Sequence, residues 1–328
     1  MAQRENVAQW RSEFIDAFIE GNEARARALV SQSGVRKARS LLEEMLEDPD
    51  ARVRMAAAFG LGELGGAASV RRLERQLALE EARGDYDGAA VVETLTQALG
   101  RVQGANARVI LVRKLERLVA ADRPEPADLI DVACALWRKR HSDLIPDIRQ
   151  ALEQLPPSAP NVLQGLLVLL EKSPEELRAW AADSSVPVEL KREVLTVLTE
   201  ELPEALVSTL PAFISSAQLL VDTAVKRKGV ASDFFVDLFS LLLSRPEHLL
   251  PMLPEVTRAE LRDLVRRLVA ATSSLKCSLQ SAVLLRHLGQ PEDSALLEAH
   301  RPADPTLAKV FDDAAQALRG LSSPGKIV

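Results

Sequence analysis

Aromatic residues are scarce in this sequence. Only 4% of its 328 residues are Phe, Trp or Tyr, and a single Tyr occurs. Because aromatic side chains dominate the cores of most globular enzymes, their scarcity disfavours one deep core. Alternating β-branched and aromatic residues, the usual sign of strands, are also missing almost everywhere. The sequence therefore predicts an all-α protein that packs mainly through Leu, Ala and Val.

Cysteine and long apolar runs are scarce as well. Cys134 and Cys277 lie far apart, each within an apolar helical pattern, so no disulfide framework or C-x-x-C motif can be built. The opening MAQRENVAQW has no apolar signal-peptide core. The longest apolar run, near Val162–Leu170, covers about half of what a membrane span needs. These features predict a soluble protein of the reducing cytoplasm, without a membrane span.

Neither charge sign is in strong excess. The 41 basic and 47 acidic residues give a net charge of −6 and a pI near 5.5. A mildly acidic chain disfavours a dedicated binder of nucleic acid or anionic membranes. The preference for Arg over Lys, 31 to 10, is typical of a high-GC bacterial genome.

The clearest internal pattern covers two helix-forming segments. The first, VRKARSLLEEMLE from Val35, has apolar residues at i, i+3 and i+4 spacing. Asp48-Pro49-Asp50 then ends this helix and begins the next, with Asp48 as the expected N-cap. The second segment, DARVRMAAAFGLGELGG, is expected to end at Gly65. Because a mid-helix glycine costs roughly 1 kcal/mol relative to Ala, Gly60 and Gly62 predict a close neighbouring helix.

This pattern carries a family resemblance. The string DPDxxVRxAAAxxLGxLG, from Asp48 to Gly65, resembles the second helix of a HEAT repeat, as in bacterial HEAT-repeat and phycobilisome-lyase-type proteins. A weaker copy follows 38 residues later, where Val92 replaces Arg54. A third copy occupies residues 303–321, after a short helix over 291–300.

The resemblance implies an α-α superhelix, a HEAT-like solenoid of antiparallel helix pairs. At about 40 residues per repeat the chain would hold roughly eight pairs. We expect one array over residues 1–321 and a disordered tail over 322–328. Within the array, the expected parts are N-terminal capping helices (1–34), the best-matching repeats (35–103), degenerate repeats (104–290) and a C-terminal repeat (291–321).

The sequence shows no recognisable catalytic or metal motif. Its four histidines have no partner at HExxH or similar ligand spacing, and G-x-S-x-G and phosphate-binding glycine loops are missing. We therefore predict no catalytic residues, no metal, no cofactor and no enzymatic activity.

Two segments are unusual for a simple solenoid helix. Arg258, Arg262 and Arg266 align like charges on one helix face, so they form either a solvated face or an anion- or nucleic-acid-binding ridge. The segment SDFFVDLFSLLLS, residues 232–244, is apolar nearly all round. Such a helix is either buried on both sides or covered by a partner.

The predicted function is a scaffold or adaptor that binds another protein through its concave groove or an exposed apolar helix. The expected contacts are Arg52, Arg54, Glu93 and Arg101 on second helices, and Phe235, Val236 and Leu243 as an apolar contact. A DNA-backbone binder is the first alternative, and a lyase- or glycosylase-type enzyme on the same scaffold is the second. Formation of a homo-oligomer stays open.

Overall fold

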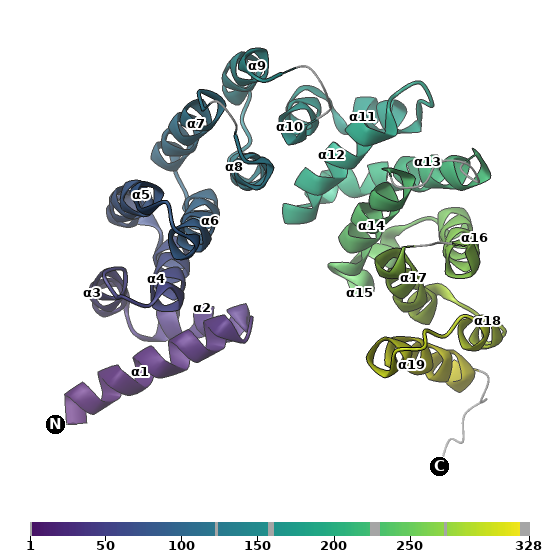
Figure 1. The fold of residues 1–328 in the computed structure, drawn as a ribbon, viewed down its shortest axis with the longest axis horizontal. Helices are drawn as coiled ribbons and strands as arrows, with labels where there is room; N and C mark the ends of the chain where they lie inside the picture. The colour runs from purple at the N-terminus through teal and green to yellow at the C-terminus, as the bar shows by residue number, and fades with distance from the viewer. Residues whose placement is uncertain (1, 122–123, 157–160, 224–229, 272–273, 322–328) are drawn as a thin grey trace. The chain divides into compact units, whose positions relative to one another are not determined.

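A computed structural model describes residues 2–121, 124–156, 161–223, 230–271 and 274–321, and all regular structure within them is helical (Figure 1). The all-α prediction is therefore confirmed. The helices, in chain order, are α1 (Ala2–Ile19), α2 (Glu23–Gln32), α3 (Val35–Met45), α4 (Ala51–Leu64), α5 (Gly66–Arg83), α6 (Tyr86–Arg101), α7 (Ala105–Val119), α8 (Pro126–Arg138), α9 (Leu144–Gln154), α10 (Val162–Glu171), α11 (Pro174–Ala182), α12 (Val188–Glu200), the 3₁₀ helix η1 (Glu204–Thr209), α13 (Leu210–Thr223), α14 (Val230–Leu243), α15 (Pro246–Met252), α16 (Glu255–Ala271), α17 (Leu275–Leu288), α18 (Asp293–Ala299) and α19 (Pro305–Leu321).

The helices form two compact units, Met1–Pro156 (unit 1) and Pro157–Val328 (unit 2). The boundary falls within the proline-rich stretch around residues 155–160. A single array over residues 1–321 stays a prediction across this boundary. The expected tail, 322–328, lies outside the described residues.

Unit 1 has two layers of helices. The second helices of successive pairs, α4, α6 and α8, pack side by side in one layer (Figure 1). The first helices α3, α5 and α7, followed by α9, form the other layer (Figure 1). Each pair packs face to face, α3 on α4, α5 on α6 and α7 on α8. At the N-terminal end, α1 and α2 both pack on α4.

Small residues bring the second helices of unit 1 into backbone contact. A Cβ placed on Gly62 would lie 3.1 Å from the Cα of Ala98 on α6. One placed on Gly100 would lie 3.0 Å from the Cα of Ala135 on α8. The expected close approach at Gly62 is thus confirmed. The same contact between a glycine and a neighbouring alanine recurs one repeat later, at Gly100. Among the described glycines, none makes such a contact between first helices, and grooves lie between α5 and α7 and between α7 and α9.

Aspartate caps begin the second helices α4 and α6. The Asp50 carboxylate accepts the Arg52 amide hydrogen at 2.9 Å, so Asp50 and not Asp48 is the N-cap of α4. The same residue type caps α6, where Asp85 accepts the Gly88 amide hydrogen at 2.6 Å. That bond, helped by the nearby Arg83 guanidinium, lowers the pKa of Asp85 below 3.8.

A polar cluster joins α2, α4 and α6 on the second-helix layer. Two guanidinium groups lie over the buried Phe59 ring, that of Arg27 at 5.8 Å from its centroid and that of Arg101 at 5.1 Å. Glu63 pairs with Arg27 at 3.1 Å, and Glu23 approaches both arginines. Cation–π contacts and ion pairs therefore attach the N-terminal helices to the first repeats.

Unit 2 is layered in the same way. Helices α10, α12, α14, α17 and α19 pack in succession in one layer, and α11, α13, α16 and α18 form the other. Backbone contact is closest between α10 and α12, where a Cβ on Gly165 would meet the carbonyl carbon of Glu193 at 2.5 Å. The stretch Glu204–Asp222 is long and apolar enough to cross a membrane by length and composition, but half of it is buried in the protein, as in a core helix.

The apolar helix α14 is buried on both sides. It packs between α12 and α17 within one layer and also contacts α13 and α15. Phe235 and Val236 are only 4% and 8% exposed, and Leu243 is half-buried. The prediction that Phe235 and Val236 face a partner is therefore wrong. Neighbouring repeats supply the cover that the all-round apolar pattern requires.

Candidate functional site

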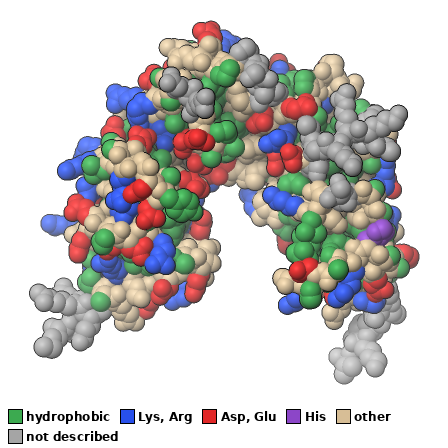
Figure 2. Space-filling view, viewed as in Figure 1, with side chains coloured by type: hydrophobic (Ala, Val, Ile, Leu, Met, Phe, Trp, Pro, Cys, Tyr) green, Lys and Arg blue, Asp and Glu red, His purple; other side chains and the backbone are tan. Residues whose placement is uncertain are grey.

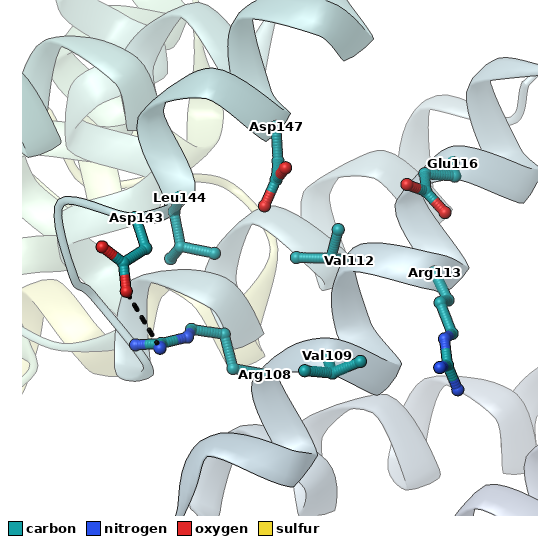
Figure 3. A pocket seen from close by; sticks show the side chains of 8 residues that line it. All are labelled: Arg108, Val109, Val112, Arg113, Glu116, Asp143, Leu144 and Asp147. Atoms are coloured by element: carbon teal, nitrogen blue, oxygen red, sulfur yellow. Dashed lines mark hydrogen bonds and ion pairs between the residues drawn. The ribbon is translucent and has the colours of Figure 1, made fainter.

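A groove lies between α7 and α9 in the first-helix layer of unit 1 (Figure 3). It encloses about 370 Å³. Its apolar floor consists of Val109, which is 47% exposed, the half-buried Val112, and the buried Leu144. Figure 3 shows Leu144 and Val112 pointing toward one another. A narrow extension continues along both helices past Leu115 and Val119 of α7.

Two carboxylates at one end of this groove have no partner. Asp147 of α9 and Glu116 of α7 form no ion pair or side-chain hydrogen bond with any residue that the structure describes. The facing residues of α9 in the extension, Gln150 and Gln154, are uncharged. Figure 3 shows Arg113 extending away from Glu116. The groove thus combines an apolar floor with two uncompensated negative charges.

The opposite end of the groove is closed by its own ion pair. Arg108 of α7 lies 3.5 Å from Asp143, just before α9 (Figure 3). An occupant would therefore meet a neutralised pair at one end and negative charge at the other.

The neighbouring groove, between α5 and α7, is bridged by ion pairs. It encloses about 320 Å³ over Leu77 and Ala78 of α5. The Glu81 carboxylate accepts hydrogen bonds from Arg117 at 3.0 Å and from the buried Lys114 at 3.4 Å. These pairs hold α5 and α7 together and leave little unsatisfied charge for a ligand.

Arg54 is buried, so the prediction that it contacts a partner is wrong. Its side chain is 3% exposed and forms a two-point ion pair with Glu80 of α5, at 2.7 and 3.2 Å. It also donates to the carbonyl oxygens of Asp48 and Pro49. The guanidinium therefore connects the turn between α3 and α4 to α5, the first helix of the next repeat. At the equivalent position of the next copy, Val92 is simply buried.

The other predicted contacts on the second helices lie at the surface or close to it. Arg52 is exposed and pairs with its own N-cap, Asp50, at 2.9 Å. Glu93 is exposed and accepts a hydrogen bond from Gln97. Arg101 is half-buried over the Phe59 ring. Of these predicted contacts, Arg52 and Glu93 have exposed side chains.

The predicted ridge of arginines on α16 is neutralised within unit 2. Arg258 pairs with Glu255, and Arg262 lies 4.0 Å from the same carboxylate. Arg262 also donates to a backbone carbonyl at the end of α17 at 2.7 Å. Arg266 forms a two-point pair with Asp293 at 2.6 and 2.9 Å. The like charges are thus compensated without a bound anion. Figure 2 shows acidic and basic side chains interspersed over the visible face of both units.

Lys191 and Asp237, two charged groups at least partly buried in unit 2, have structural partners. The Lys191 ammonium donates to the Asp183 carbonyl at 2.8 Å and to the Ser216 hydroxyl at 3.0 Å, and burial lowers its pKa below 10.5. Burial also raises the pKa of Glu193 and that of Asp237, which Arg192 contacts at 3.2 Å. Across the described residues, no group of three or more His, Cys, Asp or Glu side chains could hold a metal ion.

Sequence reasoning did not identify the α7/α9 groove. The available signal was weak: in ANARVILVRKLERLV, Val109 and Val112 extend apolar character beyond the buried stripe. The decisive feature is that the α9 residues lining the groove include no cation, which depends on which helix packs beside α7 and on which face it presents.

Comparison with known proteins supports the repeat assignment. Residues 39–66 match the HEAT repeat, the segment that carries the resemblance in the sequence, so the predicted resemblance is confirmed. No curated protein sequence matches the chain. Among solved structures, human deoxyhypusine hydroxylase in complex with glycerol is similar, with 18% identity over 87% of this chain and 97% of that one and a TM-score of 0.35.

This structural match contradicts the prediction that the chain is not an enzyme. The similar protein is itself an enzyme, a hydroxylase. At 18% identity and a TM-score of 0.35 the likeness transfers no activity, substrate or residue role to this chain.

Proposed function

We propose that this chain is a protein-interaction scaffold that binds a partner protein through the α7/α9 groove. The groove's free carboxylates carry the proposal, because the charges at its other end and those that line the neighbouring α5/α7 groove are paired within the protein. HEAT repeats offer large preformed surfaces for binding proteins, and the 39–66 match identifies such a repeat in the same unit. A cytoplasmic bacterial location, suggested by the low cysteine content and the preference for arginine, belongs to the same proposal.

The groove is preformed, which favours binding without large rearrangement. Backbone contacts at Gly62 and Gly100 fix the spacing of α4, α6 and α8, and α8 in turn packs against α7, one wall of the groove. The charge arrangement also disfavours the nucleic-acid alternative. Glu116 and Asp147 would repel phosphates, and the arginines of α16 already have acidic partners.

Site-specific photo-crosslinking in cells tests the proposal. A benzophenone amino acid is placed at Val109 in the groove, at Glu93 on the second-helix layer, or at Glu20, just after α1, as an exposed control. We expect a discrete, nuclease-resistant crosslink at Val109, identified by mass spectrometry, and none at Glu20. A crosslink at Glu93 alone would move the site to the second-helix layer. Absence of protein crosslinks at both Val109 and Glu93 would overturn the scaffold role.

A further inference from the structure

Building on the proposed function, we infer that the occupant of the α7/α9 groove is a short amphipathic helix with a basic end. It places aliphatic side chains on Val109 and Val112, and a Lys or Arg between Glu116 and Asp147. The inference deepens the proposed function because it specifies the chemistry of the partner at the same site.

The apolar floor determines where the occupant is anchored. Val109 is among the most exposed large apolar residues of unit 1, and it adjoins Val112 and the buried Leu144. Covering such side chains removes apolar surface from water, which favours association by about 25 cal/mol per Å². A groove of about 370 Å³ is at the small end of ligand-binding clefts, so it accepts a few anchor side chains and not a whole domain.

The free carboxylates determine the charge of the occupant. Glu116 lies one turn along α7 from Val112 and two turns from Val109, or about 6 and 10 Å at 1.5 Å per residue. Asp147 reaches the same end of the groove from α9 (Figure 3). A cation between these two groups would be attracted by both carboxylates and would reduce their mutual repulsion, whereas an acidic occupant would add repulsion. The paired Arg108 and Asp143 at the other end require no charge.

The walls favour a helix over an extended strand. Both walls are helices whose backbone hydrogen bonds are internal, so they offer no row of free N–H and C=O groups to a strand. A third helix can instead insert its side-chain ridge between them, as in ordinary helix packing. The expected occupant therefore has aliphatic residues at i and i+4 and a basic residue one to two turns beyond.

Fluorescence anisotropy with a designed peptide tests this inference on the full chain. The probe is a labelled peptide of about fourteen residues with two Leu one turn apart and two Arg about one turn beyond. A second probe reverses the order of Leu and Arg, and the tighter binder is used for the comparison. A matched peptide carries Gln in place of both Arg.

The protein variants are Glu116→Gln with Asp147→Asn, and a control pair, Glu20→Gln with Glu153→Gln, that removes two exposed carboxylates outside the groove. We expect the groove pair to weaken the Arg peptide roughly twofold to thirtyfold, the range for two exposed ion pairs. The control pair should leave affinity within about twofold. The Gln peptide should bind wild type weakly and lose nothing further on the groove variant. Binding should also increase the peptide's helicity by circular dichroism.

The outcomes separate this inference from the proposed function. Equal binding of the Arg and Gln peptides, or equal losses in the groove and control variants, would overturn the inference. If the Val109 crosslink still forms, the scaffold role then stands with a different occupant. If the crosslinks at Val109 and Glu93 and the peptide binding are all missing, both proposals fail.

Discussion

Two neighbouring grooves of unit 1 share helix α7 as a wall yet use their charges differently. Between α5 and α7, Glu81 faces Lys114 and Arg117, and the groove is bridged. Between α7 and α9, Glu116 and Asp147 face uncharged glutamines and apolar residues. The comparison shows that charged residues on the same helix can serve either structure or recognition, depending on the neighbouring helix.

Consecutive glutamates on α5 account for the closed groove. Glu80 turns inward to the buried Arg54 of α4, whereas Glu81 turns toward α7. One turn of α5 therefore ties together helices from three repeats. Helix α9 has no equivalent cation facing α7, so the next groove stays open.

Removal of Arg54 should break its buried ion pair with Glu80, and we expect this change to cause the largest loss of stability. Arg54→Met leaves Glu80 buried and charged without its guanidinium, and we expect a loss of about 3–5 kcal/mol in the free energy of unfolding. Urea denaturation followed by circular dichroism measures it. The control is Arg52→Met, at an exposed arginine two residues away, with an expected change within about 0.5 kcal/mol.

A double variant separates the charge from the packing. Arg54→Met with Glu80→Leu removes both buried charges and should recover most of the lost stability. A double variant as unstable as Arg54→Met alone would show that the ion pair is not the cause.

Removal of Glu81 should open the bridged groove with a smaller cost. Glu81→Gln leaves the buried Lys114 without its carboxylate, and we expect a loss of about 2–3 kcal/mol. The same denaturation measurement on Glu116→Gln, on the other side of α7, should show no comparable loss. Equal losses for the two variants would remove the distinction between the grooves.

Gly100→Ala tests the backbone contact between α6 and α8, the second helices that lie behind the bridged α5/α7 groove. Its Cβ would lie 3.0 Å from the Cα of Ala135, so overpacking should exceed the gain in helix propensity by about 1 kcal/mol. The matched control is Gly320→Ala in α19, where nothing lies within 4 Å, with an expected gain of about 0.5 kcal/mol. Thermal melts of the two variants should therefore shift in opposite directions.

The smallest effect is expected at the open groove itself. Glu116→Gln with Asp147→Asn removes two unpaired surface charges, so stability should change by less than about 0.5 kcal/mol. A large loss of stability would show that these carboxylates have a structural partner after all. The measurement is the midpoint of urea unfolding, compared with that of the Glu20→Gln and Glu153→Gln control.

Local patterns in the sequence predicted the helices well. Apolar spacing identified α3 and α4 to within a few residues, and Gly62 correctly indicated close packing. The N-cap was misplaced by two residues because Asp48 and Asp50 are both good caps, and only the turn geometry selects Asp50. Such features depend on neighbours within a few positions along the chain.

Features that depend on distant neighbours were not predictable. Helical phase placed Arg54 on an outer face, but its partner Glu80 lies 26 residues later, and their pairing becomes visible only when α5 packs beside α4. The sequence pattern alone suggested that Phe235 and Val236 form an exposed surface. In the structure they are buried, because helices from two other repeats cover α14. The α7/α9 groove was missed for the same reason.

The Phe59 cluster has a consequence for how unit 1 unfolds. A stack of repeats behaves approximately as a one-dimensional chain of coupled elements, so its ends fray before its middle. Arg27 and Arg101 contact the same ring from α2 and from α6, which couples the terminal helices to the third pair across the intervening repeat. This long coupling should suppress stepwise fraying and make the N-terminal helices exchange their amide hydrogens together with α4 and α6, as one cooperative block.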